Sequence, residues 1–171
     1  MLENKMEKEN NRGMKNAKRL RENRSLKKNT AVYIDGENIP AKKADKIISI
    51  IRDEGGVVDY IKVYGRQKDD ATKMWTVVAG YIENMKDIRL YGPPAKNKVD
   101  NKIIKDAKKA TEKNRNVDIY YIVSSDHDYV PVIAALREKG KRVVVIGEKK
   151  ASEGLRNSAN KFIQGSIPKF V

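Results

Sequence analysis

The sequence predicts an α/β fold in which helices cover both faces of a parallel sheet. Short apolar runs alternate along the chain with amphipathic stretches of about ten to fifteen residues, which is the pattern of successive β-α-β units. The apolar runs at residues 31–34, 119–123 and 143–146 also lack the alternation of apolar and polar residues that a half-exposed strand shows. Strands of this kind are typical of a sheet that is covered on both faces.

The first half of the chain holds three predicted strands, at residues 31–34, 57–64 and 88–91, and a loop at 92–94 follows the third. A helix begins after Pro40, because apolar residues recur there every three or four positions. Its inward face consists of Ala44, Ile47, Ile48 and Ile51, and the glycine pair at 55–56 ends it. The next helix is expected to turn Met74, Val77, Val78, Tyr81 and Met85 inward, with Trp75 in the core.

The second half continues the same alternation. A helix that begins near Val99 is expected to carry Ile103, Ile104, Ala107 and Ala110 inward. A fourth strand at 118–123, a helix at 129–138 and a fifth strand at 142–146 follow, and a short helix at 152–160 leads to residues 162–163. The sheet therefore has five strands, or six if that last segment joins it. In the order 3-2-1-4-5, strands one and four are neighbours where the winding reverses, and ligands bind in that crevice in open α/β sheets.

The length of 171 residues predicts one folded domain, at residues 31–165, with tails at 1–30 and 166–171. The N-terminal tail is expected to be disordered. Between residues 11 and 30 it carries eight Lys or Arg residues and one acid, Glu22, which leaves seven positive charges, half of the net +14. Such a charge favours a polyanionic partner, with nucleic acid ahead of an anionic membrane. Leu20 and Leu26 are too few large aliphatic residues for a membrane-binding helix.

The composition also excludes several classes of protein. The chain has no cysteine, so disulfides, thiolate nucleophiles and cysteine-based zinc sites are excluded. No apolar run approaches the roughly 20 residues that span a bilayer, and no signal-peptide pattern is present near the N-terminus. We therefore expect a soluble, cytoplasmic protein. A homo-oligomer is compatible with the sequence, which does not specify the oligomeric state.

Four aspartates are predicted to converge on the crevice. Asp35 ends the first strand, Asp126 and Asp128 follow the fourth, and Asp100 lies at the start of the helix after the third. With right-handed crossovers, that helix returns over strands one and four. Carboxylate oxygens suit Mg²⁺ or Mn²⁺, and a cation held there can neutralise a scissile phosphate. Together with the basic surface, this favours phosphodiester hydrolysis.

Polar residues at the same edge are candidates for substrate binding. Asn38 follows the first strand and can hold a loop, a water or a phosphate oxygen. Ser124 and Ser125 can orient a carboxylate or a water. Lys98 is close to Asp100 in sequence, and Arg66 ends the second strand, so both are candidate phosphate ligands.

Three blocks of the sequence resemble the signature of NYN domains, which are PIN-like ribonuclease domains of the LabA type. The blocks are residues 33–38, residues 98–100 and residues 123–129, and the likeness extends from about Ala31 to Ile163. Tyr129 stands where the family usually has Phe. The family lysine corresponds to Lys98, with a spacing one residue shorter, or else to Lys96 or Lys102. The resemblance implies a Rossmann-like PIN fold of three layers and a metal-dependent endoribonuclease site at Asp35, Asp100, Asp126 and Asp128.

Other interpretations of these residues stay open. Asp128 can be a helix cap, Asp35-Gly36 a turn, and Asp100 a residue that stabilises a helix start. His127 is expected to point away from the aspartates on either side. An RNA-binding module without activity is the alternative function. A phosphatase or a nucleotide-binding domain has less support, because neither a Gly-x-Gly-x-x-Gly motif nor a P-loop is present.

Overall fold

Six parallel strands form one sheet in the order β3-β2-β1-β4-β5-β6. The computed structural model describes residues 12–16, 28–55, 57–67, 70–93, 95–113 and 116–165. The strands are β1 (Asn29–Asp35), β2 (Val57–Arg66), β3 (Met85–Leu90), β4 (Val117–Val123), β5 (Arg142–Gly147) and β6 (Lys161–Gln164). The predicted fold class and strand order are confirmed, and the last apolar segment does form a sixth strand.

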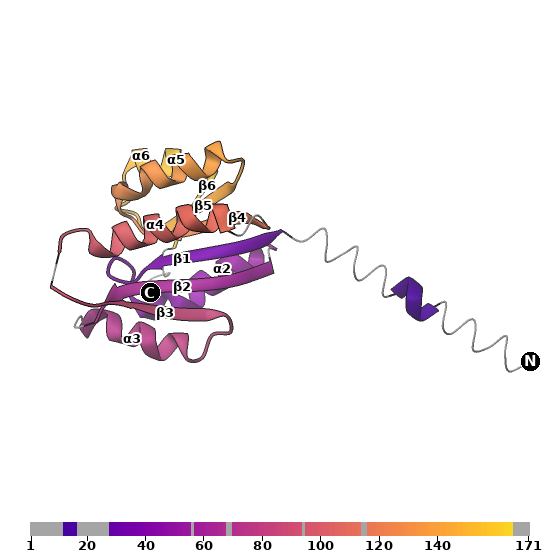
Figure 1. Ribbon diagram of the computed structural model, residues 1–171, viewed down its shortest axis with the longest axis horizontal. Helices are drawn as coiled ribbons and strands as arrows, with labels where there is room; N and C mark the ends of the chain where they lie inside the picture. The colour runs from indigo at the N-terminus through magenta and orange to yellow at the C-terminus, as the bar shows by residue number, and fades with distance from the viewer. Residues whose placement is uncertain are drawn as a thin grey trace, which may run out of the picture.

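Helices cover both faces of this sheet (Figure 1). One face carries α2 (Ala44–Asp53) and α3 (Asp70–Ala79). The other carries α4 (Lys98–Lys113), α5 (Val130–Glu138) and α6 (Glu153–Ser158). Two short 3₁₀ turns, η1 (Ala41–Lys43) and η2 (His127–Tyr129), precede α2 and α5. The molecule therefore has three layers, with the sheet in the middle.

Each face of the sheet has its own apolar core. On the first face, Ile47 and Ile51 of α2 pack with Val32 and Ile34 of β1. On the second, Ile103 and Ala107 of α4 pack in one cluster with Tyr33, Tyr120 and Ile122 of the central strands. Successive residues of a strand point to opposite faces, so β1 and β4 supply apolar side chains to both cores. This explains why their sequences show no alternation.

The structure corrects the prediction for α3. Met74, Val77 and Tyr81 are exposed at 58%, 51% and 87%, whereas Trp75 is fully buried. Met85 does not belong to this helix at all, because it opens β3 and is buried at the sheet. The apolar residues whose spacing predicted an inward face therefore lie mainly on the solvent side. The expectation that Trp75 is in the core is confirmed.

The predicted terminal tails fall mostly outside the described residues. Within residues 1–30, the structure describes a helical stretch at 12–16 and residues from 28 onward. β1 begins at Asn29, two residues earlier than predicted, and the Val57 N–H donates to the Lys28 carbonyl. The predicted tail at 166–171 also lies outside the described residues. Across the part of the chain that the structure describes, no helix has the length and apolar character needed to cross a bilayer.

The fold brings the ends of β1 and β4 together. The two strands pair in parallel up to Ile34 and Val123, so the residues that follow them leave the sheet at the same edge. α4 packs against β1, with its first turn at this edge. Three segments that are distant in sequence therefore meet at the carboxyl edge of the sheet, as expected for the winding reversal between β1 and β4.

Candidate active site

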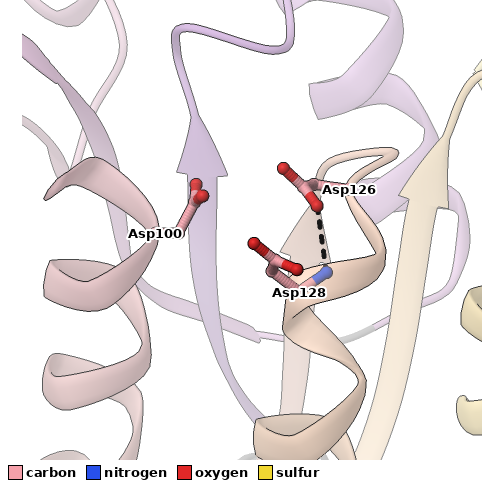
Figure 2. Close-up of side chains that lie close together, drawn as sticks. All are labelled: Asp100, Asp126 and Asp128. Atoms are coloured by element: carbon pink, nitrogen blue, oxygen red, sulfur yellow. Dashed lines mark hydrogen bonds between the residues drawn. The ribbon is translucent and has the colours of Figure 1, made fainter. Parts of the chain in front are cut away.

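Three aspartates form a compact cluster at the carboxyl edge, which we call the acid cluster. Asp100, Asp126 and Asp128 each offer a carboxylate oxygen within 4.8 Å of the others. Figure 2 shows Asp100 reaching from α4 toward the two residues that follow β4. Three of the four acids predicted from the sequence thus lie within reach of one small ion.

The loop after β4 is shaped by local hydrogen bonds. Asp126 caps η2, because its Oδ1 accepts the Asp128 N–H at 2.9 Å (Figure 2). The capping interpretation therefore applies to Asp126 rather than to Asp128. A cap of this kind fixes the backbone between the two aspartates, so both carboxylates are held close to Asp100.

Asp35 lies deeper than the acid cluster and is only 3% exposed. Its Oδ1 accepts the N–H groups of Glu37 and Asn38, each at 3.2 Å. Its Oδ2 accepts from the hydroxyls of Ser124 at 3.1 Å and Tyr129 at 3.2 Å. Asp35 is not part of the three-residue group that lies within ion-binding distance, so its role as a metal ligand remains a prediction.

Tyr129 links the buried acid to the acid cluster. Its hydroxyl contacts Asp35 Oδ2 at 3.2 Å and Asp100 Oδ1 at 2.9 Å, and the side chain is fully buried. A hydroxyl carries one proton, so it donates to one of these carboxylates at a time. This link was not predicted from the sequence, although a tyrosine at the position where NYN domains usually have Phe was a signal that its hydroxyl has a partner.

The carboxylates at the site repel one another. Burial and, after it, the charge of the neighbouring Asp100 raise the pKa of Asp35 to about 6, against hydrogen bonds from Asn38, Ser124 and Tyr129 that lower it. The pKa of Asp100 is raised by burial and by the charges of Asp126, Asp128 and Glu37, against the hydrogen bond from Tyr129. Without a cation, the site therefore favours protons on its buried acids.

Asn38, Ser124 and Ser125 hold the site together. Asn38 Oδ1 accepts the Ser125 N–H at 2.9 Å and so joins the loop after β1 to the loop after β4. Ser124 Oγ contacts Asp35 and accepts the Asp126 N–H at 3.1 Å. Ser125 Oγ accepts the Glu148 N–H at 2.8 Å. These side chains contact the framework of the site in the structure, and substrate binding by them remains a prediction.

The two predicted phosphate ligands have protein partners. Lys98 donates to the backbone carbonyls of Tyr91 and Pro93 in the loop before α4. Arg66 forms an ion pair with Glu37, which follows Asp35 in the β1 loop. The structure thus brings neither side chain into contact with the acid cluster. Their role toward a substrate also remains a prediction.

His127 lies beside the acid cluster but is held by another element. Its Nδ1 is 2.9 Å from Ser152 Oγ, and Ser152 also caps α6 by accepting the Leu155 N–H. Gly154 packs so closely against the imidazole ring that a Cβ there would lie 2.7 Å from the ring. The ring is therefore positioned by α6, and it is not one of the three clustered ligands.

The donor set fits a hard divalent cation. All three clustered ligands are carboxylates, which suit Mg²⁺ and Mn²⁺. Among the described residues, no Lys or Arg forms an ion pair with Asp100, Asp126 or Asp128. Three close carboxylates without a protein counter-charge are what a cation would stabilise, and none of the ligands is of a kind that a softer metal would require.

Comparison with known proteins identifies the family. The NYN domain model matches residues 29–166. A crystal structure of a protein of unknown function from Vibrio parahaemolyticus superposes with a TM-score of 0.66 at 18% identity and covers 81% of this chain and 93% of that one, which shows the shared fold. Acinetobacter baumannii MurG aligns with a TM-score of 0.48 at 14% identity, over 84% of this chain and 42% of that one. Among proteins with a curated description, none matches.

Proposed function

Because the chain belongs to the NYN domain family, whose members are generally nucleases, we propose that it is a metal-dependent endoribonuclease. The observation that carries this proposal is the acid cluster of Asp100, Asp126 and Asp128 at the carboxyl edge of the sheet. We assign the nuclease domain to residues 31–165, with the segments at 1–30 and 166–171 outside it. The substrate is RNA, and the net charge of +14 supports a polyanionic partner.

Asp100, Asp126 and Asp128 would hold the cation, which we propose to be Mg²⁺ or Mn²⁺. When bound, such an ion acts as a Lewis acid toward the scissile phosphate and makes a water more acidic. Asp35 lies behind these ligands and adds negative charge to the site. Its hydrogen bonds to Ser124 and to the Asn38 N–H fix where that charge lies.

The remaining residues of the site keep the three ligands in place. Tyr129 orients Asp100 through its hydroxyl, and the capping bond of Asp126 fixes the backbone of Asp128. The contact of Asn38 with Ser125 prevents the β1 and β4 loops from separating. Precise placement of this kind matters because a ligand set that is loose by about 1 Å loses much of its catalytic effect.

The proposal is tested by incubating a labelled RNA with the purified protein in Mn²⁺, in Mg²⁺ and in EDTA. Asp126→Asn is the test variant, because Asn also caps a helix and preserves the backbone. Glu112→Gln, an exposed position on α4 away from the acid cluster, is the matched control for loss of one negative charge.

We expect cleavage with either cation, no cleavage in EDTA, and a loss of at least about a hundredfold in Asp126→Asn but not in Glu112→Gln. Cleavage that persists in EDTA or in Asp126→Asn contradicts the proposal. Retention of RNA by filter binding without any cutting supports the alternative of an RNA-binding module on the same fold.

A further inference from the structure

A cavity adjoins the acid cluster, and we propose that it binds an unpaired nucleobase of the RNA substrate. The inference rests on the proposed function, because the acid cluster is taken as the place where the scissile phosphate lies. The cavity has a volume of about 320 Å³ and lies between the first turns of α4 and α5. Asp100 and Asp128, two of the three clustered acids, form part of its wall.

The chemistry of the wall distinguishes a base from a phosphate. Besides the two carboxylates, the wall consists of Asn97, Asn101, His127, Ile104, Val130 and Pro131. None of these side chains is a lysine or an arginine, although the chain carries 37 of them. The two carboxylates are the proposed ligands of the cation, and the rest of the wall carries no lysine or arginine to bind a second phosphate. Beyond the cation, the cavity therefore suits a neutral ligand that has both a flat apolar surface and polar edges.

A nucleobase matches both parts of the wall. Ile104, Val130 and Pro131 offer apolar surface for the face of a base. Asn97 and Asn101 carry amides, and each amide has donors and an acceptor that can pair with the edge of a base. Among the described residues, no hydrogen bond of either amide side chain is present, so both are available to a ligand.

The backbone that carries the polar side chains is fixed by local contacts. Asn97 adopts a left-handed conformation with φ of 57°, and its carbonyl accepts the Asn101 N–H at 3.0 Å. His127 is tied through Nδ1 to Ser152, which leaves Nε2 as the ring nitrogen for a ligand. The cavity wall thus comes from elements with fixed positions, as expected for a preformed binding site.

This assignment limits the class of substrate. A base in a duplex is paired and stacked, and it cannot enter a side cavity unless it leaves the helix. The proposed subsite therefore selects single-stranded RNA or an unpaired loop. The cleavage position is set by the nucleotide that places its base in the cavity while its phosphate lies at the acid cluster.

The test measures binding separately from cutting. In an Asp126→Asn background, the affinities for a single-stranded RNA hexamer and for the matching abasic ribose-phosphate hexamer are compared. Asn101→Ala removes one amide, and Asn97→Gly removes the other while keeping the left-handed backbone. Asn157→Ala, an exposed asparagine on α6, is the matched control.

We expect the hexamer with bases to bind about tenfold or more tightly than the abasic one, and we expect Asn101→Ala and Asn97→Gly to reduce that ratio severalfold. Asn157→Ala should leave the ratio unchanged. An equal affinity for both hexamers, or a ratio that all three variants leave unchanged, overturns the proposal. Failure of cleavage in the catalytic assay does not affect this outcome, so loss of the nuclease function and loss of the base subsite are distinguishable.

Discussion

Tyr129 connects two acidic side chains through a single buried hydroxyl. Asp35 and Asp100 both lose solvation at the site, and they share the single proton that this hydroxyl can donate. Removal of such a donor costs free energy, because it leaves a buried carboxylate with one hydrogen bond fewer. The Tyr129 hydroxyl therefore stabilises the folded protein and also fixes how Asp35 and Asp100 lie relative to each other.

We predict that Tyr129→Phe lowers the free energy of unfolding by about 1–3 kcal/mol at neutral pH in EDTA, since two buried carboxylates lose their shared donor. Urea denaturation measures this change. Tyr120→Phe is the matched control, because the Tyr120 hydroxyl is buried and has no hydrogen-bond partner among the described residues. Its removal should be neutral or slightly stabilising. Equal losses in the two variants would show that the contact of Tyr129 with the acids contributes nothing.

Asp35 should give the metal-free protein a characteristic pH dependence. Its pKa in the folded state is raised to about 6, so the folded protein holds a proton that the unfolded chain releases above about pH 4. The free energy of unfolding therefore falls as the pH rises from about 4 to about 6 and is flat above that range. The loss is up to about 3 kcal/mol, from about 1.4 kcal/mol for each unit of pKa.

The measurement is denaturation of wild type and Asp35→Asn in EDTA across this pH range. The difference in the free energy of unfolding between wild type and Asp35→Asn should change with pH. Wild type should lose stability relative to the variant as the pH rises toward 6. If the free energies of unfolding of the two proteins changed with pH in parallel, the raised pKa of Asp35 would be contradicted.

The four acids of the site were predicted from the sequence, but the burial of Asp35 apart from the acid cluster was not. Asp126 and Asp128 follow a strand and Asp100 begins a helix, so their convergence follows from the strand order. The depth of Asp35 could not be predicted, because it depends on how Tyr129 and Ser124 pack behind the acid cluster. Such contacts between distant segments leave no periodic signal in the sequence.

At the scale of elements, the strands were predicted well and the faces of the helices unevenly. The apolar face of α2 was predicted correctly, because Ala44, Ile47, Ile48 and Ile51 recur every three or four positions and all four are buried. α3 has apolar residues on both sides, so Met74 and Val77 were predicted to face inward along with Trp75, and of these three only Trp75 is buried. Trp75 reaches the core and donates from its ring nitrogen to the Ile39 carbonyl at 2.8 Å.

We predict opposite outcomes for two substitutions on α3. Trp75→Ala should lower the free energy of unfolding by about 3–5 kcal/mol, because it empties a fully buried site. Val77→Lys should change it by less than about 0.5 kcal/mol, because Val77 is 51% exposed. Thermal or urea denaturation at low protein concentration checks both values. A large loss for Val77→Lys would mean that this side of α3 is covered in solution.

At the scale of the whole molecule, charge is distributed unevenly along the chain. Half of the net charge of +14 lies between residues 11 and 30, before the folded domain, whereas the acid cluster concentrates negative charge at one edge of the sheet. A basic segment of this kind binds phosphates independently of the RNA sequence. Its contribution to the affinity for RNA falls steeply as the salt concentration rises.

We predict that deletion of residues 1–27 weakens RNA binding at low salt and reduces the salt dependence of binding, while the catalytic rate constant stays within about twofold. The deletion stops before Lys28, whose carbonyl accepts the Val57 N–H. Binding isotherms at several salt concentrations and single-turnover cleavage measure the two effects. A large fall in the rate constant with an intact fold would show that the N-terminal segment takes part in catalysis.

The central claim is that Asp100, Asp126 and Asp128 hold the cation that RNA cleavage requires. The measurement that tests it most directly is anomalous diffraction from crystals soaked in Mn²⁺ at a concentration that supports cleavage. We predict an anomalous peak in contact with carboxylate oxygens of all three residues, and no such peak in crystals of Asp126→Asn. A protein that cleaves RNA under these conditions but binds Mn²⁺ elsewhere, or not at all, would contradict the claim.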